Sequence, residues 1–247
     1  MPRLAIIGDV HGAQEKLDLV LPQVYNAHPD AVLMVGDLGS ERNLLDTAMA
    51  VLERVSQLDL PILYVPGNHD LPDLPDHALA RNVDHRVLEV AGLRVWGIGG
   101  SGPNQWGFPY EWSEDMLRQR PRERADILLA HCPPLDTPLD PTTRGEHVGS
   151  QAMRELLQER RFELMACGHI HESPSCAKID GVVCVNAGAL GVPFGAPQFV
   201  VVDWEPKRIQ VRHVVLPYIL QPESAPWCKG LEWGPDPGER SWAFKRS

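Results

Sequence analysis

The sequence predicts an α/β protein with a parallel sheet, because short apolar segments alternate with segments of helical length in its first half. Residues 3–7, 31–35 and 61–65 are strand-like, and residues 13–25 and 42–58 between them have helical periodicity. Right-handed βαβ crossovers bring the carboxyl ends of such strands to one edge of the sheet. Ligands of open α/β sheets bind at that edge.

The alternation of strands and helices is interrupted in the middle of the chain. Residues 71–84 are polar and rich in proline, which predicts a loop. Residues 86–90 and 93–98 flank Ala-Gly and predict a hairpin, and a glycine-rich loop with several aromatic residues follows at 99–110.

Strand and helix then alternate again. Ser113 is the expected N-cap of a short helix, and Ser150 is the expected N-cap of a helix that runs to about residue 161. Residues 127–130 and 164–167 are short apolar strands, and residues 138–147 form a long irregular loop. Polar residues follow both strands directly.

The last third of the main domain has a different pattern. Four short runs separated by turns predict an antiparallel meander: 176–179, 182–185, 199–204 and 208–214. We assign residues 1–216 to one domain and residues 217–247 to a C-terminal extension. The extension is rich in Pro and Gly, yet it contains Trp227, Trp233 and Trp242. Disordered tails are poor in aromatic residues, so we expect it to pack on its own domain or at an oligomer contact.

Composition excludes several classes of protein. The chain has 247 residues, 43% of them hydrophobic and 23% charged, as in ordinary soluble domains. No apolar run approaches the roughly 20 residues that span a bilayer, and the apolar N-terminal run is too short for a signal peptide. We therefore expect a cytoplasmic protein without membrane contact. A net charge of −10 argues against binding to polymeric nucleic acid, and five scattered cysteines argue against a disulfide framework.

Polar side chains with metal-binding chemistry follow five of the predicted strands, and glycine adjoins all but one of these groups. The candidate ligands are Asp9, His11, Asp37, Asn68, His131, His169 and His171. Carboxylate, imidazole and amide groups suit Mn²⁺, Fe or Zn²⁺ rather than a sulfur-bound metal. One ion with an open position needs about three or four protein ligands, so seven candidates indicate two ions that share a carboxylate.

Other polar residues near these motifs are candidates for substrate contacts. His69 and Asp70 directly follow Asn68. Arg144 and His147 lie in the loop after His131, and the glycine-rich loop holds the aromatic residues Trp106, Phe108 and Tyr110. These three aromatic residues are suited to stack a base or aryl group, or alternatively to pack within their own loop. The remaining histidines are interpreted as structural: His28, His77, His85 and His213.

Taken in order, these motifs closely resemble those of the calcineurin-like metallophosphoesterases. The motifs are Asp9-x-His11, Gly36-Asp37, Gly67-Asn68-His69-Asp70, His131-Cys-Pro-Pro and Gly168-His169-x-His171. The stretch from His131 to Gly188 is most similar to small bacterial and archaeal phosphoesterases that share the motifs of class III cyclic-nucleotide phosphodiesterases. The resemblance covers residues 3 to about 215.

The resemblance implies a fold and a role for each motif residue. It implies a four-layer α/β/β/α sandwich of two mixed sheets with a dinuclear centre, for which we favour Mn²⁺ and keep Fe and Zn²⁺ as alternatives. Asp9, His11 and His171 would bind one ion, Asn68, His131 and His169 the other, and Asp37 would bridge them. His69 would act as general acid, with Asp70 fixing its imidazole.

The function that we predict from the sequence is metal-dependent hydrolysis of a small phosphate ester. A phosphodiesterase with a bridging hydroxide nucleophile is the first hypothesis. A phosphomonoesterase acting on nucleotides or proteins is the alternative. A non-catalytic scaffold of the same fold is a third reading, and it is disfavoured by the complete set of candidate ligands.

Overall fold

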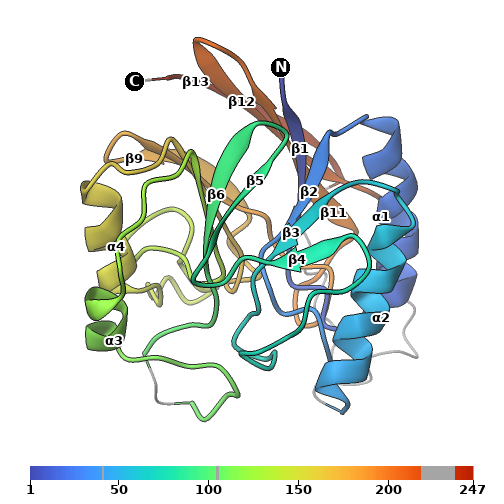
Figure 1. Ribbon diagram of the computed structural model, residues 1–247, viewed down its shortest axis with the longest axis horizontal. Helices are drawn as coiled ribbons and strands as arrows, with labels where there is room; N and C mark the ends of the chain where they lie inside the picture. Colours follow the sequence, from blue (N-terminus) through green and yellow to red (C-terminus); the bar gives the residue numbers. More distant parts are fainter. Residues whose placement is uncertain (41, 104–105, 218–236, 247) are drawn as a thin grey trace.

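Two mixed β-sheets pack face to face, and helices cover their outer faces in four layers, α/β/β/α (Figure 1). The computed structural model describes residues 1–40, 42–103, 106–217 and 237–246. This architecture confirms the two-sheet sandwich predicted from the sequence.

The first sheet combines parallel and antiparallel strands, in the order β13–β12–β11–β1–β2–β3–β4. Its strands are β1 (Arg3–Ile7), β2 (Ala31–Met34), β3 (Ile62–Tyr64), β4 (Ala80–Asn82), β11 (Gln198–Trp204), β12 (Arg208–Val215) and β13 (Gly238–Lys245). Strands β1 to β4 pair in parallel, whereas β11 joins β1 in antiparallel orientation and continues into β12 and β13.

The second sheet has the order β5–β6–β7–β8–β10–β9. Its strands are β5 (Val87–Val90), β6 (Leu93–Ile98), β7 (Ile127–Ala130), β8 (Leu164–Cys167), β9 (Ser175–Ile179) and β10 (Val182–Asn186). The four central strands are parallel, and the antiparallel strands β5 and β9 form its edges.

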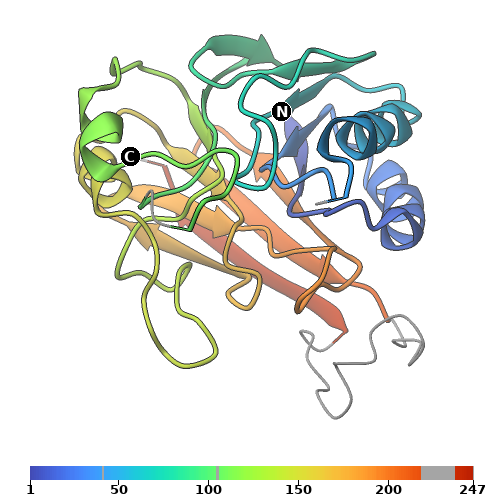
Figure 2. The same cartoon turned by 90° about the horizontal axis from the view of Figure 1, so that it is seen from below.

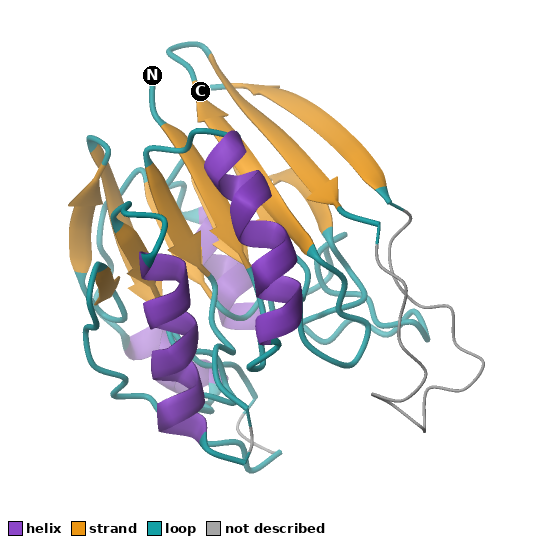
Figure 3. Ribbon diagram, turned by 90° about the vertical axis from the view of Figure 1, so that its right-hand side faces the viewer, coloured by secondary structure: helices purple, strands orange, loops and turns teal. Residues whose placement is uncertain are grey.

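The helices are divided between the two outer faces. Helices α1 (Gln14–Asn26) and α2 (Leu44–Ser56) cover the first sheet and stand in front of it in Figure 3. Helices α3 (Glu114–Gln119) and α4 (Gln151–Gln158) cover the second sheet. The hydroxyls of Ser113 and Ser150 accept hydrogen bonds from backbone N–H groups at the starts of α3 and α4, which confirms both predicted N-caps.

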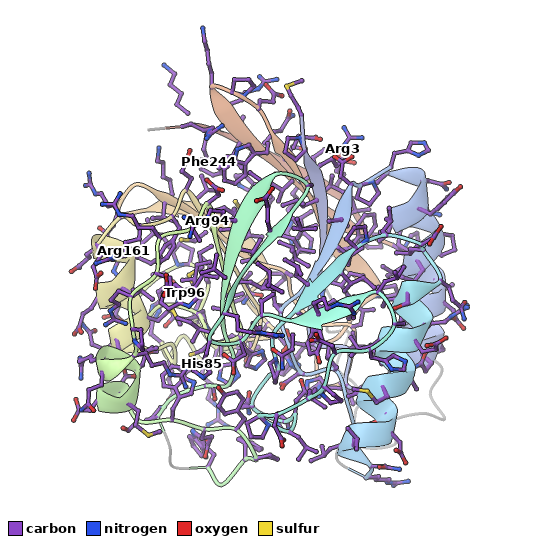
Figure 4. All side chains as sticks on the ribbon, in the orientation of Figure 1. Arg3, His85, Arg94, Trp96, Arg161 and Phe244 are labelled. Carbon is purple, nitrogen blue, oxygen red and sulfur yellow. The ribbon has the colours of Figure 1, made fainter. Side chains whose placement is uncertain are left out.

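Alternation along the buried strands builds three apolar layers. In β1, Leu4 and Ile6 face the second sheet, whereas Ala5 and Ile7 face α1 and α2. Trp96, which is labelled in Figure 4, belongs to the third layer, between the second sheet and α4. The strand ends that carry the polar motifs are therefore fixed by burial on both faces.

Two expectations about local structure need correction. Residues 71–84 are mainly loop, as expected, but they also contain the short strand β4, which pairs with β3 through backbone groups. Such an edge strand of three residues after a Pro-rich segment gives no clear sequence pattern. Helix α4 ends at Gln158 rather than near residue 161.

The prediction that the four C-terminal strands form one antiparallel meander was also wrong. Strands β9 and β10 pair with each other in the second sheet, whereas β11 and β12 pair in the first. Residues 187–197 cross between the sheets, because β10 also pairs with β8 and so leaves no free side for β11.

Beyond residue 216, β13 pairs along its whole length with β12. Trp242 packs against the apolar layer between the sheets, whereas Trp227 and Trp233 lie outside the described residues. None of the helices in the described ranges has the length and apolar character needed to cross a bilayer.

Candidate metal centre

The polar motifs from both sheets meet at one side of the molecule. Strand β1 begins near the top of Figure 1 and runs downward, so the carboxyl ends of the parallel strands face the viewer in Figure 2. Asp9, Asp37 and Asn68 follow strands of the first sheet, and His131 and His169 follow strands of the second. Because the sheets face each other, these side chains converge across the seam between them.

The backbone turns sharply where several of these side chains emerge. Asp9, His11, Asp37 and His169 have positive φ angles of 40°, 46°, 51° and 69°. Non-glycine residues rarely adopt this conformation, and it concentrates at functional sites. A Cβ on Gly67 would lie 2.0 Å from Asp37 Oδ1, so glycine is required there for the two turns to approach each other.

Asp9, His11, Asp37 and His171 form one group of metal-binding side chains. Each offers one ligand atom, and these atoms all lie within 4.8 Å of one another. The Nε2 atoms of His11 and His171 are 3.2 Å apart, and His171 Nε2 is 3.6 Å from Asp9 Oδ1. This spacing is suited to a single divalent ion.

A second group shares Asp37 with the first. His131 Nε2 lies 2.8 Å from Asn68 Oδ1 and 3.5 Å from Asp37 Oδ2. The same Asp37 oxygen is 3.5 Å from His11 Nε2 in the first group. The His169 ring centroid is 5.0 Å from that of His131. Asp37 therefore lies between two sets of candidate ligands, the position that a bridging carboxylate would occupy.

Two backbone carbonyls orient the imidazoles. The Nδ1–H of His131 donates to the Val35 carbonyl at 2.8 Å, and the Nδ1–H of His171 donates to the Pro193 carbonyl at 2.8 Å. In the neutral form of each imidazole, these bonds place the proton on Nδ1 and leave the lone pair of Nε2 directed into the groups. That is the tautomer that a metal ligand requires.

The electrostatics also suit cations. Burial opposes ionisation of Asp37, but the imidazoles of His131, His11 and His69 more than offset it and hold the pKa of that carboxyl below its ordinary value. Burial and the neighbouring His131 lower the pKa of His169 to about 3, so its imidazole is neutral at pH 7. Burial disfavours the charged form of His171, but its hydrogen bond to Asp9 more than offsets this and raises the pKa of His171 to about 8. A divalent ion bound there would therefore displace a proton from His171.

His69 borders the shared carboxylate. Its backbone N–H donates to Asp37 Oδ1 at 2.9 Å, and its ring centroid is 5.3 Å from that of His11 and 4.1 Å from that of Phe108. The side chain is only partly buried. A substrate bound at the metal positions could therefore reach it.

Asp70 lies beneath the centre and is fully buried. Its carboxylate accepts hydrogen bonds from the backbone N–H groups of Leu38, Gly39 and Gly67, at 2.8–3.0 Å. Asp70 thus ties the turn that carries Asp37 to the turn that carries Asn68. These bonds assign it to the backbone of the two turns, a contribution that the family resemblance did not suggest.

The three proposed substrate contacts lie outside the two buried groups. Trp106 is 70% exposed, and Arg144 is exposed at the tip of the loop after β7. His147 Nδ1 is 2.7 Å from the buried carboxylate of Asp140. The hydrogen bond to that carboxylate raises the pKa of the His147 imidazole, although desolvation acts in the opposite direction.

Sequence reasoning missed the groups that support the ligands. The Val35 and Pro193 carbonyls have no side-chain signature. Lys16 is 3% exposed, and its Nζ donates to the Gly195 carbonyl at 2.9 Å. The only available signal was a lysine beside Leu17, next to the buried stripe of α1.

Comparisons with known proteins agree with this centre. Residues 2–173 match the calcineurin-like phosphoesterase family model. An uncharacterized protein of Methanocaldococcus jannaschii is 28% identical over 73% of this chain and 85% of its own length. A probable cyclic nucleotide phosphodiesterase of a Pseudoalteromonas species is 27% identical over 64% of this chain and 62% of its own length.

Solved structures share the fold at low sequence identity. A dimetal phosphatase from Danio rerio has a TM-score of 0.60 and 12% identity, covering 85% of this chain and 95% of its own. A Vps29 variant from Entamoeba histolytica has a TM-score of 0.52 and 11% identity, covering 99% of each chain.

Proposed function

Because this chain belongs to the calcineurin-like phosphoesterase family, we propose that it is a metal-dependent phosphodiesterase. The observation that carries the proposal is the position of Asp37, whose Oδ2 lies 3.5 Å from His11 Nε2 on one side and 3.5 Å from His131 Nε2 on the other. Two divalent ions bound there would supply an activated water and neutralise charge on the phosphoryl oxygens.

The chain's own residues would act on the bound ester in distinct ways. Asp9, His11 and His171 would hold one ion, and Asn68, His131 and His169 the other, with Asp37 shared. His69 would donate a proton to the departing alkoxide, since it is partly exposed beside Asp37. Asp70 would keep the turns of Asp37 and Asn68 in register through its backbone hydrogen bonds.

Charge supports a diester rather than a monoester as substrate. A monoester carries an additional negative charge that favours Arg or Lys in the site. The five ligand motifs contain no Arg or Lys. Arg144 is exposed on a loop, and Lys16 is engaged by the Gly195 carbonyl. We propose Mn²⁺ and keep Fe and Zn²⁺ as alternatives, because oxygen and nitrogen ligands suit all three metals.

The test is hydrolysis of bis(4-nitrophenyl) phosphate and 4-nitrophenyl phosphate by chain reconstituted with Mn²⁺, with and without chelator. We expect kcat/KM for the diester to exceed that for the monoester by about tenfold or more, a difference of about 1.4 kcal/mol in barrier. Asp18→Asn, which changes a half-exposed carboxylate on α1, is the control for Asp37→Asn.

Three results would overturn the proposal. Faster turnover of the monoester would indicate a phosphomonoesterase. If Asp37→Asn keeps both its activity and its bound metal, the Asp37 carboxylate is not shared between two ions. Absence of turnover with Mn²⁺, Fe²⁺ or Zn²⁺, together with no metal binding by calorimetry, would favour a scaffold.

A further inference from the structure

One carboxylate organises the aromatic loop beside His69. The carboxylate of Glu111 accepts hydrogen bonds from three consecutive backbone N–H groups, those of Trp106, Gly107 and Phe108, the shortest at 2.8 Å. Gly107 has a φ of +78°, which permits the tight turn that directs all three groups toward Glu111. Glu111 therefore holds the backbone of residues 106–108 in one turn.

The same loop is attached to the turn that carries Asn68 and His69. The Tyr110 N–H donates to the Asn68 carbonyl at 3.1 Å, and the Gly100 N–H donates to the Pro66 carbonyl at 2.9 Å. The Phe108 ring lies against the His69 ring with centroids 4.1 Å apart and planes at 46°. A leaving group that receives the His69 proton would thus lie beside Phe108.

The three aromatic residues of the loop have different surroundings. The Tyr110 hydroxyl donates to Asp84 at 2.6 Å and lies 3.1 Å from Nε2 of His85, which is labelled in Figure 4, so Tyr110 is a structural anchor. Trp106, by contrast, is 70% exposed. An exposed aromatic side chain adds little to stability, but attachment to a backbone segment that Glu111 already holds lowers the entropic cost of binding a planar ring.

We propose that Trp106 and Phe108, held in place by Glu111, bind a planar aromatic group on the leaving side of the diester. This proposal rests on the proposed phosphodiesterase function and narrows its substrate class to nucleoside or aryl esters. Glu111 is then a positioning residue for substrate specificity, because it contacts the loop backbone. Stacking on an aromatic side chain is worth about 1–3 kcal/mol, or about 5–150-fold in affinity.

The kinetic test compares methyl phenyl phosphate with a methyl fluoroalkyl phosphate whose leaving group has comparable acidity. In the Mn²⁺-loaded chain we expect Trp106→Ala to reduce the ratio of aryl to alkyl kcat/KM by about tenfold, through KM. Glu111→Ala keeps the indole but removes its support, and we expect about a threefold fall in the same ratio. Trp106→Phe should restore part of the ratio.

Met116→Ala is the matched control, because Met116 is a 54% exposed apolar side chain on the neighbouring helix α3. Its aryl-to-alkyl ratio should equal that of the unmodified chain. If Trp106→Ala leaves the ratio unchanged while its thermal unfolding is normal, or if it lowers kcat equally for both esters, the loop is structural and the proposal is wrong.

A binding measurement separates this proposal from the proposed function. Adenosine, with ribose as the non-aromatic control, is titrated calorimetrically into metal-free chain. We expect adenosine to bind and ribose not to bind, and we expect Trp106→Ala to weaken adenosine binding about tenfold. Adenosine binding without turnover of any ester would refute the phosphodiesterase proposal but keep the aromatic surface. Turnover of diesters by a chain that binds adenosine no better than ribose would keep the phosphodiesterase proposal and refute the aromatic surface.

Discussion

At the scale of single residues, the histidines differ in the group that their Nδ1 atom contacts. His131 and His171 donate Nδ1–H to backbone carbonyls and present Nε2 to the candidate metal positions. His147 instead places Nδ1 against the carboxylate of Asp140, which favours the charged form. The partner of Nδ1 therefore decides which ring nitrogen of each imidazole is available for another contact.

His69 is suited to proton donation, which gives a prediction about leaving groups. We expect His69→Ala to retain its metal ions and to lose at least about a hundredfold in kcat on diesters with alkyl leaving groups. The loss on 4-nitrophenyl esters should be about tenfold smaller, because a good leaving group needs little protonation. Bound metal is measured by elemental analysis. Equal losses on both ester classes would contradict a proton-donor role.

His213 gives a prediction about the pH dependence of stability. Its Nε2–H donates to Gln198 at 2.9 Å, Arg240 lies 3.3 Å from Nδ1, and the side chain is buried. Burial, with a contribution from Arg240, lowers the pKa of His213 from 6.5 to about 4. Between these values the unfolded chain takes up a proton that the folded chain rejects, so stability falls as pH falls.

The expected loss of stability follows from the lowered pKa of His213. A pKa lowered from 6.5 to about 4 corresponds to a loss of about 3 kcal/mol of unfolding free energy below pH 4. Urea unfolding at pH 7 and pH 4.5 should therefore show a larger loss for the unmodified chain than for His213→Gln. Parallel losses in the two proteins would show that His213 titrates normally in the folded state.

At the scale of elements, the crossover at residues 187–197 links the two sheets and supports the centre. Its Pro193 carbonyl orients His171, and its Gly195 carbonyl accepts a hydrogen bond from buried Lys16 on α1. The Leu190 and Gly191 N–H groups donate to the Asp9 carbonyl, at 3.1 and 2.8 Å. The segment thus contacts ligand-bearing turns of both sheets.

Lys16→Met tests whether this crossover positions His171. We expect Mn²⁺ affinity to fall about tenfold, as is typical when the groups that orient metal ligands are removed. Thermal stability in the absence of metal should stay level or rise, since burial disfavours the Lys16 charge and lowers its pKa. Lys16→Arg keeps a donor and should recover part of the affinity. Unchanged Mn²⁺ affinity by calorimetry would refute this positioning role.

The element scale also shows how far the sequence was informative. Each polar motif directly follows a buried strand, so local pattern sufficed to locate turns such as those of Asp37 and His131. The pairing of β10 with β8 and the position of β13 depend on contacts far apart along the chain, which periodicity does not contain. Carbonyl groups such as that of Pro193 can be contributed by any residue, so no sequence pattern could identify them.

At the scale of the whole molecule, the candidate centre lies at the seam between two sheets whose facing sides pack through a large apolar layer. Asp37 belongs to the first sheet and His131 to the second, with 3.5 Å between Oδ2 and Nε2. Asp9 Oδ1 and His131 Nδ1 make a similar approach at 3.9 Å. Ions bound here would connect the two sheets as well as bind a phosphate ester.

Metal binding should therefore raise the stability of the whole fold. A ligand at a hundred times its Kd adds about 2.7 kcal/mol to the unfolding free energy, which corresponds to about 5–10 °C in Tm for a domain of this size. We expect a shift of that order when Mn²⁺ is added to chelator-treated chain. Differential scanning calorimetry measures it directly.

Asp37→Asn provides the discriminating variant. An amide lacks the charge and the second anionic oxygen that a bridging position needs, so at least half of the Mn²⁺-dependent Tm shift should disappear. Asp203→Asn, a partly buried carboxylate on β11 that pairs with Arg3, should keep the full shift despite its own change in stability. If Asp37→Asn retains the full shift and still binds two ions per chain, the carboxylate does not connect the two sheets through metal, and direct contacts between the sheets hold the seam together.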